Sequence, residues 1–334
     1  MDLVLAQSAA PGATLVVPAG WWVVLLVLVA ALILADLLVF NREAHEIRLR
    51  EAAVSSAVWI AIGLAFGVAV WIGLGAEAGG QYFAGYLIEK SLSVDNVFVW
   101  AVILTYFAVP GAYQHRVLFW GIFGALVMRA IFIFAGVALL DRLGWLVLVF
   151  GVFLLITGAR VATHSGDEIH PERNPLLNLL RRRMNMTDDY HGTKFFIRDA
   201  GALVATPMFA VLVLVEFTDV LFAIDSIPAI LAVSRSPFIV FSSNAFAILG
   251  LRALYFVLAG FRDRLVHLNK GLGVILVYVG VKMLLSFWDI HLPIALSLGI
   301  IVAILTVTVV VSLRAPVRGA ELEGEGAGPP STHD

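Results

Sequence analysis

The chain has 334 residues, of which 61% are hydrophobic and only 14% are charged. An ordinary soluble domain carries about 25% charged residues, so this composition argues against a soluble globular protein and is typical of one embedded in a bilayer. The net charge of −2 says little about partners, and the absence of cysteine excludes a disulfide framework, a thiolate metal site and a thiol nucleophile.

Nine apolar segments follow one another along the chain, each long enough to cross about 30 Å of hydrocarbon as a helix of about 20 residues. They lie near residues 20–40, 53–74, 82–108, 117–140, 143–162, 201–233, 238–260, 271–288 and 292–313. The sequence therefore predicts an all-α, polytopic membrane protein. Its spans form two groups, residues 20–162 and 200–313, separated by a polar loop at 163–199.

The basic residues predict the orientation of these spans. Lysine and arginine gather after the first, third, fifth, seventh and ninth segments, whereas the opposite loops hold only Arg142 and Arg235. Under the positive-inside rule the N-terminus lies outside and the C-terminus in the cytoplasm. Residues 1–19 are then an external tail, 163–199 a cytoplasmic loop, and 314–334, rich in Gly, Glu and Pro, a disordered cytoplasmic tail.

Short matches between the two halves indicate an internal repeat. They recur in the same order and at nearly constant separation, pairing residues 95–98 with 219–222, 129–136 with 252–260, and 151–152 with 280–281. Spans three to five would then repeat as spans six to eight. Because a shift of three spans reverses orientation, the prediction is an inverted-topology repeat, an arrangement that many transporters use. Similar composition of apolar helices is the alternative explanation.

Five carboxylates fall within the third and sixth spans. Each Asp near the centre of a membrane helix costs roughly 2.5 to 3.5 kcal/mol on insertion scales, so these groups are not expected to face lipid. The predicted metal ligands are Glu89, Asp95, Glu216, Asp219 and Asp225, with Asn96, Ser226 and Asn244 as additional oxygen donors. Oxygen donors without histidine or cysteine favour hard divalent ions such as Mg²⁺, Ca²⁺ or Mn²⁺.

Four basic residues also fall within spans and are predicted to be intramembrane counter-charges: Lys90, Arg129, Arg252 and Lys282. They either tune the acidic site or replace the ion when it is empty. The structural alternative is a buried ion-pair network that only holds the bundle together. Pro228, in the unusually long sixth span, predicts that this helix is broken and that its freed carbonyls join the ligands.

At these residues the chain resembles the TerC family of membrane proteins, and in particular its Alx-like members. The resemblance is carried by SLSVDNVFVW (residues 91–100), VEFTDVLFAIDSIPAI (215–230) and NAFAILGLRALYFVLAG (244–260). Residues 120–136 and 190–209 are similar too. The resemblance implies an inner-membrane manganese exporter, and the acidic motif positions of the family carry over onto Glu89, Asp95, Glu216, Asp219 and Asp225.

The leading hypothesis is thus a secondary transporter, not an enzyme, that exports Mn²⁺ or a similar divalent cation through an acidic mid-membrane site. Proton antiport is a compatible coupling, since the same carboxylates can exchange a metal for protons. The expected partners are the transported ion and the lipid bilayer, with no nucleic acid, no permanently bound cofactor and the oligomeric state left open.

Two other functions compete with transport. One is a membrane scaffold or sensor in a metal or tellurite stress-response complex. The other is an intramembrane hydrolase in which Asp95 and Asp219 form an aspartate dyad.

Overall fold

The computed structural model describes residues 17–39, 49–163, 180, 183–187, 189–199, 202–258, 268–288, 290 and 292–314. Most of both predicted tails and of the loop at 163–199 lies outside these residues. The helices are α2 (Ala19–Val39), α3 (Leu49–Leu74), α4 (Ala76–Tyr106), α5 (Gly111–Arg142), α6 (Leu146–Thr163), α8 (Pro207–Leu231), α9 (Pro237–Leu249), α10 (Leu251–Leu258), α11 (Leu268–Phe287) and α12 (Ile294–Arg314).

Eight candidate membrane spans are present in the described part of the chain, with α9 and α10 together forming one of them. The 31-residue α4 is also long enough to cross, but Glu77, Glu89, Lys90 and Asp95 make it more polar than the others. The prediction of an all-α, polytopic membrane protein is confirmed. The N-outside orientation stays a prediction.

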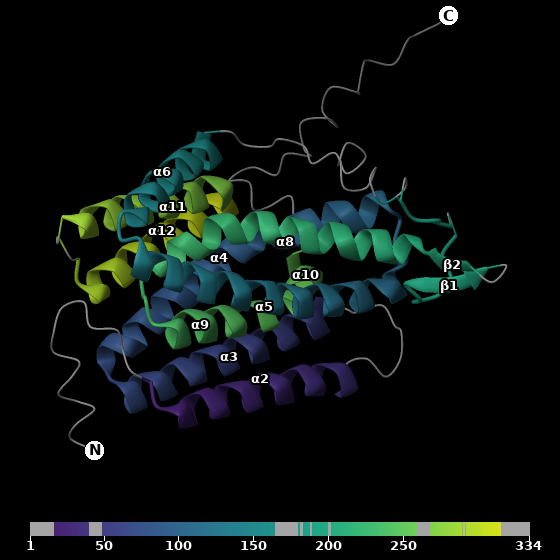
Figure 1. The fold of residues 1–334 in the computed structure, drawn as a ribbon, viewed down its shortest axis with the longest axis horizontal. Coiled ribbons are helices and arrows are strands. Elements are labelled where there is room, and N and C mark those ends of the chain that lie inside the picture. Colours follow the sequence, from purple (N-terminus) through teal and green to yellow (C-terminus); the bar gives the residue numbers. More distant parts are fainter. Residues whose placement is uncertain are drawn as a thin grey trace, which may run out of the picture.

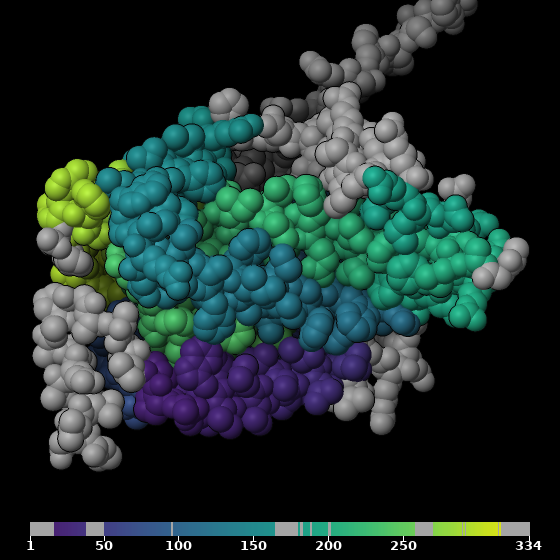
Figure 2. All heavy atoms as spheres, in the orientation of Figure 1, coloured from purple at the N-terminus to yellow at the C-terminus, as the bar shows by residue number. Residues whose placement is uncertain are grey.

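The span formed by α9 and α10 lies at the centre of the bundle and is almost entirely buried. It contacts α3, α4 and α5, while α6, α11 and α12 lie together on one flank (Figure 1). Figure 2 shows α2 along one edge of the molecule. Its Val23 and Val27 are 61% and 63% exposed, as expected for side chains that face lipid.

The helices α6 and α11 pack backbone to backbone through glycine. A Cβ built on Gly151 would lie 3.3 Å from the carbonyl oxygen of Gly280, and one built on Gly280 would lie 3.0 Å from that of Gly151. Gly158 and Gly273 form a second reciprocal pair at 2.8 and 2.6 Å. The residue number falls in α11 as it rises in α6, so the two helices are antiparallel. Small residues permit this close approach in membrane helices.

The sixth predicted span begins later than expected. Residues Ala202–Ala205 form strand β2, which pairs antiparallel with β1 (Phe196–Asp199), and α8 starts only at Pro207. Thr206 is extended, and proline at the first helical position is pre-organised to begin a helix. Helix α8 therefore begins several residues after the predicted span edge near 201, and a short hairpin that sequence analysis did not identify protrudes at one end of the bundle (Figure 1).

The predicted break in the sixth span is also wrong. Helix α8 runs unbroken through Pro228 to Leu231. The proline removes its own N–H hydrogen bond to the carbonyl oxygen of Ile224, and the helix continues on both sides of it. The break occurs in the next span, at Gly250 between α9 and α10. There Lys90 Nζ donates a hydrogen bond of 3.1 Å to the carbonyl oxygen of Ala247, and its charge complements the C-terminal end of the α9 dipole.

The described segment before β1 packs against the turn between α4 and α5. The Tyr190 hydroxyl donates to the carbonyl oxygen of Phe107 at 2.6 Å, and Arg116 Nη1 donates to Thr193 Oγ1 at 2.7 Å. Burial raises the pKa of Tyr190 above its ordinary value, so the hydroxyl keeps its proton and remains a donor at neutral pH. These contacts join the loop to the end of the bundle that is predicted to face the cytoplasm.

Candidate functional site

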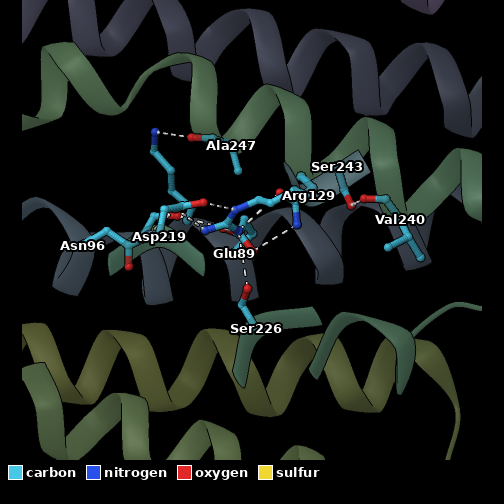
Figure 3. Close-up of polar contacts among 11 residues, drawn as sticks. Glu89, Asn96, Arg129, Asp219, Ser226, Val240, Ser243 and Ala247 are labelled. Atoms are coloured by element: carbon cyan, nitrogen blue, oxygen red, sulfur yellow. Dashed lines mark hydrogen bonds and ion pairs between the residues drawn. The ribbon is translucent and has the colours of Figure 1, made fainter. Parts of the chain in front are cut away.

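Three charged side chains meet in the middle of the bundle. Glu89, Arg129 and Asp219 each lie near the middle of their helices, α4, α5 and α8, and are 0%, 1% and 2% exposed. Figure 3 shows Glu89 and Asp219 turned toward Arg129. A buried charge requires a partner of opposite charge, and here one guanidinium serves two carboxylates.

Arg129 binds the two acids in different ways. It binds Asp219 in a bidentate contact, in which Nη2 donates to Oδ1 at 3.0 Å and Nε donates to Oδ2 at 3.4 Å. Its Nη1 forms the ion pair with Glu89 Oε1. The planar guanidinium suits such a bridge because its N–H groups point in fixed directions.

Neutral side chains complete the shell of Glu89. Asn244 of α9 donates from Nδ2 to Glu89 Oε2 at 3.1 Å, while its Oδ1 accepts from Arg129 Nη1 at 3.3 Å. Ser93, one helical turn after Glu89, donates to Glu89 Oε1 at 3.0 Å. Sequence analysis missed Ser93, although its position four residues after a buried acid was a usable signal.

Asp219 and the guanidinium have neutral partners too. Asn96 Nδ2 donates to Asp219 Oδ1 at 3.2 Å, and Ser226 Oγ accepts from Arg129 Nη1 at 3.4 Å. The structure thus brings together two of the five predicted acids, all three predicted neutral donors and one predicted counter-charge. We name Glu89, Arg129, Asp219, Asn96, Ser226, Asn244 and Ser93 the central cluster.

The central cluster borders a small cavity of about 60 Å³ between α4, α5, α6, α8 and α11. Asn96, Arg129 and Ser226 line it on the cluster side, together with Asp225. Its remaining wall is apolar and consists of Leu92, Val161, Phe222, Leu272 and Leu276. A volume of this size holds a few water-sized groups.

The other predicted acids lie apart from the central cluster. Glu216 lies against Gly124 at the contact of α5 with α8, and the half-buried Asp225 lines the cavity. The side chain of Asp95 lies outside the described part. Within that part, no three acidic or histidine side chains are grouped so that they could hold a metal ion. In this conformation Arg129 occupies the space between Glu89 and Asp219.

Of the other predicted counter-charges, Lys90 binds the Ala247 carbonyl oxygen and Lys282 is half-buried on α11. Arg252 does not face the central cluster: its Nη2 pairs with Asp36 Oδ1 of α2. Sequence analysis overlooked Asp36. This acid lies inside the first span and, like the other five, is too costly to leave facing lipid without a partner.

Comparison with known proteins agrees with these features. Residues 74–319 match the family described as "Integral membrane protein TerC family". The membrane protein STKORF319 of Myxococcus xanthus is 48% identical over 90% of this chain and 96% of its own length. Alx of Escherichia coli (strain K12), a suggested membrane-bound redox modulator, is 46% identical over 89% of this chain and 95% of its own.

A membrane protein of Rickettsia felis is 35% identical over 87% of this chain and 97% of its own length. No solved structure matches the chain. The family match covers more than half of the chain and includes every helix that supplies the central cluster. The chain is a multi-pass membrane protein that belongs to the TerC family.

Proposed function

We propose that this protein is a secondary transporter that exports divalent metal cations, Mn²⁺ foremost, from the cytoplasm. The observation that carries the proposal is the pair of fully buried carboxylates, Glu89 and Asp219, at mid-helix and surrounded by neutral oxygen-bearing side chains. With both acids ionised, the single guanidinium of Arg129 leaves one negative charge, which favours binding of a cation. The choice of Mn²⁺ and the outward direction rest on the resemblance to the family.

A polar stripe along α4 supports a route across the membrane. Gln81, Gly85, Glu89, Ser93 and Asn96 recur every three or four residues and therefore share one helix face of about 22 Å. At the end predicted to lie outside, Ser234 Oγ donates to Gln81 Oε1 at 2.6 Å.

The packing also supports the inverted repeat that we propose for spans three to five and six to eight. The proposed repeat matches α4 with α8 and α5 with α9. The contact of α4 with α9 then corresponds to the contact of α8 with α5, and both are present. The repeat pairs α6 with α11, and their reciprocal glycine contacts are what a two-fold axis between antiparallel helices produces. Rocking of one repeat against the other would open the central cluster to each side in turn.

The metal is the transported substrate, and we propose no permanently bound cofactor and no enzymatic activity. The predicted aspartate dyad of a hydrolase needs two carboxylates that share a proton. Both carboxylate oxygens of Asp219 instead accept hydrogen bonds from Arg129. Proton antiport remains the proposed coupling, because carboxylates released by the metal can bind protons.

The name of the relative Alx raises redox modulation as a second candidate. This chain contains no cysteine, so a thiol–disulfide mechanism has no residue here to carry it. The remaining alternative, a membrane scaffold or sensor, predicts no metal flux in purified protein.

Flux in proteoliposomes tests the proposal. Protein reconstituted into liposomes that contain an Mn²⁺-sensitive dye is expected to move Mn²⁺. Glu89→Gln and Asp219→Asn are each expected to lower the rate by about 100-fold or more, because each replaces a charged ligand by a neutral side chain of nearly the same shape. Glu77→Gln is the matched control, since Glu77 lies on the same helix but is exposed. Undiminished flux in both central variants would contradict this site.

The position of Glu216 gives a second test. A Cβ at Gly124 would fall within the Glu216 carboxylate, so Gly124→Ala must displace that group. Because misplacing a functional group by about 1 Å can cost up to about 100-fold in rate, we expect a loss of flux of about tenfold with little loss of stability. Gly299→Ala is the control, because nothing lies within 4 Å of that position. Equal flux in the two variants would exclude Glu216 from the pathway.

A further inference from the structure

Arg129 occupies the position in which the proposed substrate would have to bind. Arg129 is 1% exposed, and its guanidinium contacts four side chains: Glu89, Asp219, Ser226 and Asn244. A divalent cation bound by Glu89 and Asp219 together would lie against a fixed positive charge in a low-dielectric interior, which is strongly unfavourable. Arg129 must therefore leave at least one of these acids before the ion can bind both.

The cavity beside the central cluster provides the space for this movement. Arg129 itself forms part of its wall, and so does Asp225, a carboxylate that takes no part in the central cluster. Ser226 already accepts from Arg129 Nη1 at 3.4 Å and is adjacent to Asp225 in α8. A shift of the guanidinium past Ser226, along the cavity that Arg129 and Asp225 both line, brings it to a new carboxylate.

We propose that Arg129 is a tethered cation that alternates with the metal ion. In the ion-free state it neutralises Glu89 and Asp219, and in the ion-bound state it lies in the cavity and pairs with Asp225. This inference rests on the proposed function and deepens it. The buried acids then have a positive partner at every stage, and only an ion with more than one charge displaces the guanidinium, so the exchange selects divalent over monovalent cations.

Binding of Mn²⁺ measured by calorimetry in lipid nanodiscs tests the exchange. Arg129→Gln is expected to bind Mn²⁺ about tenfold or more tightly, because no internal cation competes, and to lose most of its flux because nothing displaces the bound ion. Arg252→Gln is the matched control. It removes a membrane arginine that pairs with Asp36, outside the central cluster, and leaves the Mn²⁺ affinity unchanged.

A double-mutant cycle identifies the role of Asp225. If Asp225 pairs with Arg129 in the ion-bound state, Asp225→Asn weakens Mn²⁺ binding about fivefold or more in the wild-type background. The same substitution has no effect on Mn²⁺ binding when Arg129→Gln is already present. An Asp225 effect that persists in the Arg129→Gln background would make Asp225 a metal ligand and overturn the exchange. Weaker binding by Arg129→Gln alone would overturn it as well.

Two further results complete the test. A wild-type protein that binds no Mn²⁺ contradicts the transporter proposal itself, and the exchange with it. Should Arg129→Gln not fold, Leu276→Cys reports on the cavity, because Leu276 lines it and the chain has no other cysteine. Mn²⁺ is expected to slow modification of this cysteine by a membrane-permeant thiol reagent, as Arg129 enters the cavity. An unchanged rate would overturn the exchange.

Discussion

Glu89→Ala is expected to lower the free energy of unfolding by about 3–5 kcal/mol, because it leaves several buried hydrogen-bond donors without their acceptor, at about 1–3 kcal/mol each. The substitution leaves Arg129 with Asp219 as its single charged partner and removes the acceptor of hydrogen bonds from Ser93 and Asn244. A fully buried side chain cannot recover these interactions from water. Chemical denaturation in detergent micelles measures the change.

Glu77→Ala is the control for this prediction, since Glu77 lies on the same helix α4 and is exposed. We expect a change within about 0.5 kcal/mol there, as for most surface substitutions. Equal effects of the two substitutions would mean that the central ion pairs contribute nothing measurable to the fold. The rate of Mn²⁺ flux is read in parallel, because a stable variant without flux separates a functional role from a structural one.

Removing all three charges together distinguishes the two explanations of the central cluster. Combined replacement of Glu89, Arg129 and Asp219 by leucine or methionine leaves no buried charge unpaired, and such replacements are often neutral or stabilising. If the combined variant is as stable as the wild type yet carries no Mn²⁺, the charges are needed for transport and not for the fold.

Hydropathy and charge were sufficient to locate the helices and the unusual acids. The free-energy cost of a charge in lipid forces it inward whatever its partner, so Glu89, Arg129 and Asp219 could be assigned to the interior from sequence. Their pairing could not, because it joins positions 40 and 90 residues apart and depends on how α4, α5 and α8 pack. The pair of Arg252 with Asp36 spans 216 positions and was missed for the same reason.

The errors in where helices begin and break come from ambiguous signals in the nearby sequence. The apolar run at Ala202–Ala205 continues directly into α8, so hydropathy alone could not separate a strand from a helix. Proline at 228 suggested a break, yet the loss of one N–H donor left α8 continuous to Leu231. The break at Gly250 has a weaker signal, since single glycines are common in membrane helices and only the position of Lys90 reveals the freed carbonyl.

The contact of α6 with α11 is the second place where a large effect is expected. Gly273→Val is predicted to destabilise the protein by about 3 kcal/mol or more, at the upper end of what overpacking usually costs. A Cβ at Gly273 would lie 2.5 Å from the backbone nitrogen of Ala162 and 2.6 Å from the carbonyl oxygen of Gly158. Backbone atoms cannot turn aside as side chains do, so the two helices must separate.

Gly299→Ala is again the matched control, because its Cβ meets open space in α12 and alanine favours a helix by up to about 1 kcal/mol over glycine. We expect its thermal unfolding temperature in detergent to stay the same or rise, while that of Gly273→Val falls. Val161 of α6 and Leu272 of α11 both line the cavity beside Arg129, so separation of these helices also enlarges that cavity. A Gly273→Val protein as stable as the wild type would show that α6 and α11 do not make this close contact.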